Sequence, residues 1–179
     1  SPLTGLLLDS KGHGEDYYRY RSRMKQYMEN RPYESYSIVS AAGHRLQGYY
    51  YRSGEQPVQI IALLVHGYRS EHNETVGPYY DYYMSRGIDI FACDHAAHVQ
   101  SEGEVIGYGV TESRDCLQWL SFLLDTFGSD TEFILHGFSM GAATVMMMSD
   151  QVPSNVRFIV DDSGYARVSD ILKPSLKVL

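Results

Sequence analysis

A tight bend between a strand and a helix is predicted at Gly137-Phe138-Ser139-Met140-Gly141, and it leaves few folds open to this chain. The apolar run EFILH stands directly before the bend, and a helical pattern begins at Met140. In such a turn the serine is held in a strained conformation, and a side chain at either glycine would collide with neighbouring backbone. The hydroxyl is then expected at the carboxyl end of the sheet, beside the positive end of a helix. The pattern predicts Ser139 as a nucleophile.

Strand and helix patterns alternate on both sides of this bend. The runs QIIALLV, IDIFACD, EFILH and VRFIVD have the length and apolar character of strands buried on both faces. Helices are predicted between them at residues 75–86, 112–127 and 140–150. Before them, SYSIVS and HRLQGYYY are typical of a β-hairpin at a sheet edge. The order predicts an α/β fold, a three-layer sandwich whose mostly parallel sheet has an antiparallel edge hairpin.

The ends of this sandwich raise two further expectations. Apolar residues at three- and four-residue spacing predict an amphipathic helix over 15–30, so we divide the chain into an amino-terminal helical segment, 1–34, and an α/β core, 35–179. Another helix is predicted to begin at Ser169. The last predicted strand, VRFIVD, would leave an apolar edge unpaired, which is an aggregation hazard. We expect a partner chain, or residues absent from this sequence, to cover that edge.

A second motif, His66-Gly67-Tyr68, ends the strand QIIALLV. An acyl-transfer site needs two backbone N–H donors for its oxyanion, one from the residue after the nucleophile and one from the loop after an adjacent strand. The backbone N–H groups of Met140 and Tyr68 fit these two positions. For His66 we favour a packed residue that braces the loop over a role in proton transfer.

Charge and composition exclude several other functions. The net charge is −7, the isoelectric point is about 5.4, and no basic cluster is long enough to follow a phosphate backbone, which argues against nucleic acid as a partner. Cys93 and Cys116 lack the spacing of metal ligands and are expected to be buried thiols. The pair His95 and His98 is likewise not expected to bind a metal. Most of the sixteen tyrosines should serve packing, although such rings also suit the walls of an apolar pocket.

From about Ser35 onward the chain resembles the α/β-hydrolase superfamily. Its segments LLVHGYRS, IFACDHAAHVQSEG, ILHGFSMGAATV and FIVDDSGYARVSDIL, with residues 107–119, look like a group of bacterial serine esterases and peptidase-like hydrolases, often membrane-anchored. The resemblance implies an eight-stranded sheet, a triad in the order serine, acid, histidine, and no cofactor. It also implies a small-molecule acyl substrate. Because the chain opens without methionine, a membrane anchor before residue 1 is one expectation. Two compartments remain as alternatives, the cytoplasm and the outer side of a bacterial membrane.

The sequence departs from this group in two places. Relatives carry a pattern like DxRxHGxS where this chain has residues 94–101, DHAAHVQS, so the usual arginine and glycine are missing. No histidine follows His136, so the triad acid and histidine are expected beyond Leu179, in a carboxy-terminal half that this sequence lacks. Asp161 and Asp162 end the last strand, where a minority of such enzymes place the acid, but a role in bracing the loop is favoured. Without a base the serine is an ordinary alcohol, and the chain alone should be nearly inert.

The leading hypothesis is a serine hydrolase that cleaves a carboxylic ester through an acyl-enzyme on Ser139. Amide hydrolysis and acyl transfer remain alternatives because the motif specifies the nucleophile and not the leaving group. A non-catalytic α/β-hydrolase scaffold that binds a ligand or partner is the alternative from another class.

Overall fold

A six-stranded sheet forms the centre of the computed structural model, which describes residues 13–54, 57–169 and 171. Across the sheet the strands lie in the order β1-β2-β4-β3-β5-β6. Four of them, β4, β3, β5 and β6, are parallel, and β2 runs antiparallel to both β1 and β4. The strands are β1 (Glu34–Val39), β2 (Arg45–Tyr51), β3 (Ile60–Val65), β4 (Asp89–Asp94), β5 (Glu132–Phe138) and β6 (Val156–Asp162). The predicted mostly parallel sheet with an antiparallel edge hairpin is therefore confirmed.

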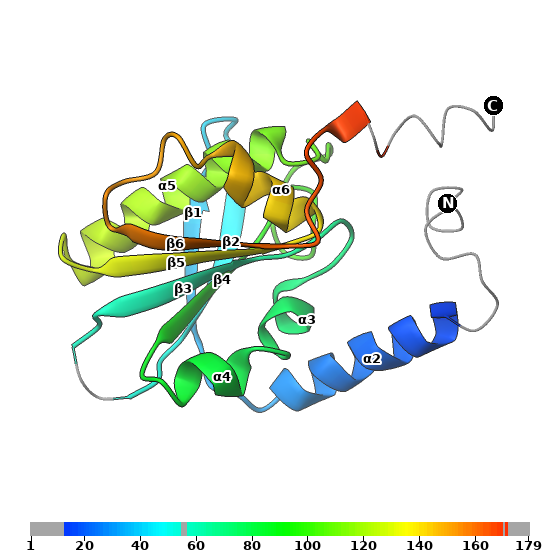
Figure 1. The fold of residues 1–179 in the computed structure, drawn as a ribbon, viewed down its shortest axis with the longest axis horizontal. Coiled ribbons are helices and arrows are strands. Elements are labelled where there is room, and N and C mark those ends of the chain that lie inside the picture. Colours follow the sequence, from blue (N-terminus) through cyan, green and yellow to red (C-terminus); the bar gives the residue numbers. More distant parts are fainter. Residues whose placement is uncertain (1–12, 55–56, 170, 172–179) are drawn as a thin grey trace.

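Helices cover both faces of this sheet (Figure 1), which makes three layers. On one face lie α5 (Val110–Phe127) and α6 (Met140–Met147), and on the other lie α2 (His13–Met28), α3 (His72–Val76) and α4 (Tyr80–Met84). Strand β3 shows why both faces must be covered: Ile61, Leu63 and Val65 pack in the core on the α5 side, and Ala62 and Leu64 pack on the other. All five side chains are fully buried, as the continuous apolar run predicts.

Two helices differ from the sequence prediction. The helix predicted over 75–86 is divided into α3 and α4, because Pro78 has no N–H with which to continue the ladder of hydrogen bonds. The predicted helix over 140–150 ends at Met147. Residues 168, 169 and 171 are helical, but much of the helix predicted to begin at Ser169 lies outside the described residues.

The outer edge of the sheet is formed by β6. Within the described residues β6 pairs only with β5, so its other side has no neighbouring strand. The side chain of Phe158 on this strand is 66% exposed. Six strands are described, against the eight that the family resemblance implies. No helix in the described part of the chain has both the length and the apolar character needed to span a membrane.

Candidate active site

Ser139 lies in the bend between β5 and α6, in a conformation that few residues other than glycine adopt. Its φ is 51° and its ψ is −111°, which places the residue in the strained left-handed half of backbone space. The Ser139 N–H donates a hydrogen bond to the Asp162 carbonyl, 2.9 Å away at the end of β6. The residue is exposed, so its hydroxyl can be reached from outside the protein.

The two glycines of the motif allow the bend to close. A Cβ atom on Gly137 would lie 2.2 Å from the carbonyl oxygen of Gly141. A Cβ atom on Gly141 would lie 2.0 Å from the carbonyl oxygen of Val65. Both distances are far inside van der Waals contact, and in both cases the obstacle is backbone that cannot turn aside. The helix after the serine can therefore lie directly against the end of β3.

The loop after β3 meets this bend because β3 and β5 are adjacent and parallel, with Val65 opposite Gly137. A Cβ atom on Gly67 would lie 3.4 Å from the Cβ atom of Ser139 and 4.0 Å from its Oγ. Tyr68 and Ser139 line the same cavity. Met140, 1% exposed, begins α6 directly after the serine. The structure thus brings together the three residues that the sequence analysis selected.

This cavity has a volume of about 490 Å³. Its walls come from the loop after β3, the segment around Pro78 and Tyr79, the bend itself and Asp162. A further wall comes from α2, which contributes Tyr17, Tyr18, Tyr20 and Arg21. Sequence analysis missed this contribution. The helical spacing of the tyrosines was visible, but nothing in it indicated which part of the fold the helix would lie against.

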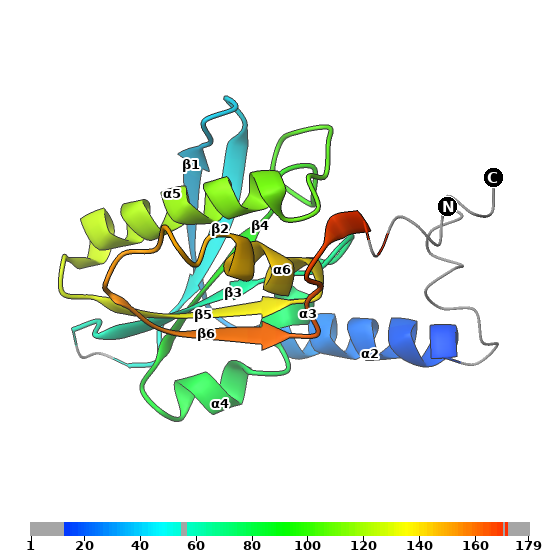
Figure 2. The same cartoon turned by 45° about the horizontal axis from the view of Figure 1, so that its top comes forward.

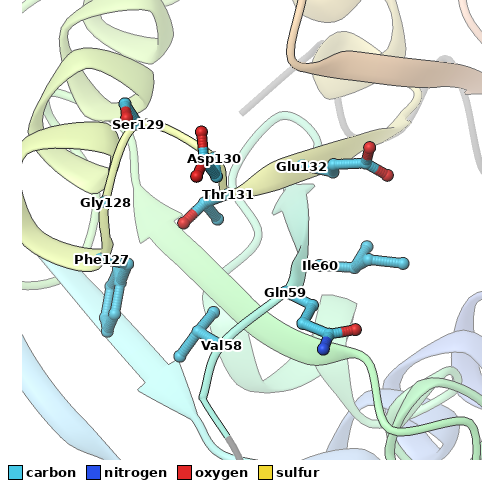
Figure 3. Close-up of a pocket in the computed structure, with 9 residues that line it drawn as sticks. All are labelled: Val58, Gln59, Ile60, Phe127, Gly128, Ser129, Asp130, Thr131 and Glu132. Carbon is cyan, nitrogen blue, oxygen red and sulfur yellow. The ribbon is translucent and has the colours of Figure 1, made fainter.

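A second hollow, of about 540 Å³, lies at the opposite end of the sheet (Figure 3). Its residues precede or begin β3 and β5 and include Gln59, Ser129, Asp130 and Glu132. In parallel α/β sheets, ligands bind at the carboxyl ends of the strands. We therefore assign the site to the cavity that contains Ser139, although the second hollow is slightly larger.

Three buried histidines, His66, His95 and His98, lie behind the loop that carries Tyr68. His66 Nδ1 donates to the Gly67 carbonyl at 2.8 Å, while its Nε2 accepts the backbone N–H of His95 at 3.0 Å. His95 Nε2 donates to the His66 carbonyl at 3.1 Å. His98 Nε2 accepts the backbone N–H of Arg69 at 3.1 Å. These bonds hold the residues on both sides of Tyr68, and they assign to His66 the bracing role that sequence analysis favoured.

Because His66 Nε2 accepts a hydrogen bond while Nδ1 donates one, the His66 ring is uncharged. Burial, together with the proximity of His95 and His98, lowers the pKa of His66 well below its usual value. Burial and the neighbouring His98 lower the pKa of His95 to about 3. Rings held neutral in this way keep a fixed tautomer, so the loop has a single hydrogen-bonding arrangement at neutral pH.

The loop of residues 94–101, which departs from the family pattern, is held by hydrogen bonds of the Ser101 side chain. Ser101 Oγ donates to the Asp94 carbonyl at 2.6 Å and accepts the backbone N–H of Gln47 at 2.9 Å. Val99, where relatives carry the glycine, has a φ of 48°. A β-branched residue is strained in this region, so valine at position 99 has an energetic cost.

The two aspartates at the end of β6 differ in their surroundings. Asp161 Oδ1 accepts the backbone N–H of Gly164 at 2.8 Å and so braces the following loop. Asp162 lines the cavity, and its carboxylate accepts the hydroxyl proton of Tyr79 at 3.0 Å. Within the described residues the Ser139 hydroxyl has no hydrogen-bond partner. His136, on β5, shares a hydrogen bond of 2.9 Å with the Tyr83 hydroxyl.

One group of side chains has the chemistry of metal ligands. Ligand atoms of Cys93, His95 and Cys116 lie within 4.8 Å of one another, and all three residues are buried. The cysteines are free thiols, as sequence analysis expected. A hydrogen bond with Cys93, together with burial, raises the pKa of Cys116 well above its usual value, which favours the neutral thiol over the thiolate that binds metals. We assign no metal to this group.

Comparisons with known proteins bear on the fold of the chain. No protein-family model matches the chain. Monoglyceride lipase of Mus musculus is 31% identical over 157 residues, which cover 84% of this chain and 50% of the lipase. An uncharacterized protein of Bacillus subtilis strain 168, YqkD, is 28% identical over 113 residues, 63% of this chain and 36% of that protein. The structure of an esterase from Pyrococcus furiosus is similar with a TM-score of 0.68 and 22% identity, covering 83% of this chain and 56% of the esterase. The chain thus spans half or less of the two curated relatives.

Proposed function

We propose that this chain, which has the fold of the α/β hydrolases, is part of a serine hydrolase that cleaves a carboxylic ester through an acyl-enzyme on Ser139. The observation that carries the proposal is the position of Ser139. It is exposed, has a φ of 51° and lies in a cavity beside the loop after β3. The relatives described as a lipase and an esterase support an ester as the substrate.

In this reaction Ser139 Oγ attacks the acyl carbonyl carbon while its proton passes to a base. The carbonyl oxygen becomes an oxyanion, for which the backbone N–H groups of Tyr68 and Met140 are the proposed donors. Each such donor contributes about 3 kcal/mol to stabilising the transition state. The alcohol leaves with a proton as the acyl-enzyme forms. Water then attacks the acyl group, releases the carboxylic acid and returns the proton to Ser139.

Within the described residues no histidine forms a hydrogen bond with Ser139 Oγ, so they do not show the base that this mechanism needs. His66, His95 and His98 are engaged in the loop, and His136 pairs with Tyr83. The family resemblance implies an acid and a histidine that follow the serine in chain order. The proposed activity is therefore that of the whole protein, in which a histidine would have to reach Ser139 Oγ.

Labelling with a fluorophosphonate tests this proposal on the full-length protein. Such probes react with serines that are activated as nucleophiles, so the protein should be labelled, and Ser139→Ala should abolish labelling. Ser154→Ala is the matched control, because Ser154 is exposed and lies before β6, at the other end of that strand. Labelling that persists in Ser139→Ala would refute the nucleophile, and a folded wild-type protein that is not labelled would favour the non-catalytic scaffold.

The leaving group needs a separate measurement. Ester hydrolysis predicts turnover of short acyl esters of 4-nitrophenol by full-length protein that has not been treated with the probe, with little turnover of the matching anilides. Faster cleavage of the anilides would indicate an amidase, and transfer of the acyl group to an added alcohol in preference to water would indicate an acyltransferase.

A further inference from the structure

Helix α2 precedes the sheet in the chain, yet its first half lies against the cavity of Ser139. In Figure 2 the helix passes α3 on the side of the molecule toward which β5 and β6 point. The side chains of Tyr17 and Tyr20 line the cavity with Phe138 and Tyr79. Tyr17 and Tyr20 are each 39% exposed, so part of each side chain faces solvent. The cavity is thus lined on one side by aromatic rings from a helix that precedes the sheet in the chain.

An ion pair fixes α2 at this position. Arg21 Nε lies 2.6 Å from Glu74 Oε1, and the Glu74 side chain is only 4% exposed. The Arg21 guanidinium also donates to the Arg69 carbonyl at 3.0 Å, in the loop that carries Tyr68. Ser70 Oγ donates to the second oxygen of Glu74 at 2.7 Å. Because a buried carboxylate requires its partners, the helix cannot leave this position without a large energetic penalty.

The carboxyl end of α2 supplies a second anchor. Met28 is 2% exposed and packs in the core on the α4 side of the sheet. Lys25 Nζ lies 3.0 Å from Glu71 Oε1. The Tyr27 ring makes an edge contact with that of Tyr80 on α4. With its end buried and its middle held by an ion pair, the helix presents Tyr17 and Tyr20 to the cavity as a fixed wall.

The charges at the cavity are engaged by the protein itself. Arg21 pairs with Glu74, Asp162 accepts a hydrogen bond from Tyr79, and the Arg69 guanidinium lies over the ring of Tyr68, 5.3 Å from its centre. What the wall offers a ligand is therefore the faces and edges of aromatic rings. Rings of this kind bind apolar groups, and the cavity volume of about 490 Å³ is in the range of small-molecule sites.

We propose that α2 is the acyl-binding wall of this site, and that it selects esters whose acyl part is an apolar chain long enough to lie along Tyr17 and Tyr20. This inference rests on the proposed function, because it requires an acyl group on Ser139. It assigns selectivity to a helix that comes before the sheet in the chain.

The test compares 4-nitrophenyl octanoate with 4-nitrophenyl acetate on the full-length protein. The measured quantity is the ratio of the two kcat/KM values, octanoate over acetate. The double variant Tyr17→Ala/Tyr20→Ala should lower this ratio about tenfold, which is the effect of losing the burial of roughly two methylene groups. Tyr17→Phe/Tyr20→Phe keeps both rings and should retain the wild-type ratio. Circular dichroism establishes that each variant is folded.

Tyr82→Ala is the matched control, because Tyr82 is a 52% exposed tyrosine on α4 that does not line the cavity. It should leave the ratio unchanged. An unchanged ratio in the folded alanine double variant, with Ser139 still labelled by fluorophosphonate, would overturn the acyl-wall inference alone. A folded wild-type protein that shows neither labelling nor hydrolysis would instead overturn the proposed function, and this inference with it.

Discussion

Acidification should destabilise the protein because two buried histidines in the loop cluster are held neutral. His66 and His95 are 0% and 2% exposed, and both have a pKa below the ordinary value, about 3 for His95. In the unfolded chain a histidine has a pKa of about 6.5. Between these values the unfolded state binds more protons than the folded state. Stability is therefore fully present above about pH 6.5 and is lost as the pH falls toward 3.

The size of the effect follows from the two pKa values of His95. At pH 5, protonation of the unfolded chain lowers the free energy of unfolding by about 2 kcal/mol for each histidine that stays neutral when folded. His95 alone should therefore cost about 2 kcal/mol between pH 8 and pH 5, and the lowered pKa of His66 acts in the same direction. Domains of this size are stable by only about 5–15 kcal/mol, so the loss should be easily measured.

Urea denaturation of the full-length protein at pH 8, 7, 6 and 5, followed by circular dichroism, gives the slope of stability against pH. His95→Gln should reduce the slope between pH 6 and pH 5 by about 1.3 kcal/mol per pH unit, because one proton-binding group is removed. His44→Gln, in the turn between β1 and β2, is the control and should leave most of the slope in place. An unchanged slope in His95→Gln would refute the argument, as would a wild-type stability that does not fall below pH 6.

The remaining predictions concern packing and charge. Gly137→Ala should destabilise the protein by about 3 kcal/mol or more, because the added Cβ atom would lie 2.2 Å from a backbone oxygen. Gly54→Ala is the control, since a Cβ atom there would have no neighbour within 4 Å, and it should change stability by less than about 1 kcal/mol. Equal shifts in melting temperature for the two variants would contradict this prediction. Arg21→Ala should cost about 3 kcal/mol because it leaves Glu74 buried without its main partner. Arg19→Ala, which breaks an exposed pair on the same helix, should cost less than about 1 kcal/mol in the same urea titration.

The sequence predicted best those features that depend on neighbouring residues. The strand EFILH, the glycines at 137 and 141 and the start of the helix at Met140 are local features, and the structure has them at the predicted positions. The approach of Tyr68 to Ser139 also follows from the sequence, because it needs only that two parallel strands be adjacent. The catalytic roles of these residues remain predictions, which the labelling experiment tests.

What the sequence could not predict depends on contacts between distant residues. Arg21 and Glu74 are separated by 53 positions, and neither belongs to a motif. The division of the helix at Pro78 was readable from the missing N–H of proline, but the periodicity of the tyrosines around it obscured the break. The neutral state of His95 depends on burial and on the nearby His98, which no spacing rule encodes. The wall that α2 contributes to the cavity and the cluster of His66, His95 and His98 are therefore visible only in the structure.

These distant contacts meet at one residue, Arg69, directly after the proposed oxyanion donor. Its backbone N–H is held by His98 at 3.1 Å, and its carbonyl accepts a hydrogen bond from Arg21 at 3.0 Å. The peptide groups on both sides of the Arg69 Cα atom are thus fixed, one by the core and one by α2. An oxyanion donor is effective when it is already oriented before charge develops, because no energy is then spent on turning it. If Tyr68 has the proposed role, undocking of α2 should lower the rate for short and long esters alike, whereas loss of the tyrosine rings alone should change only the preference between them.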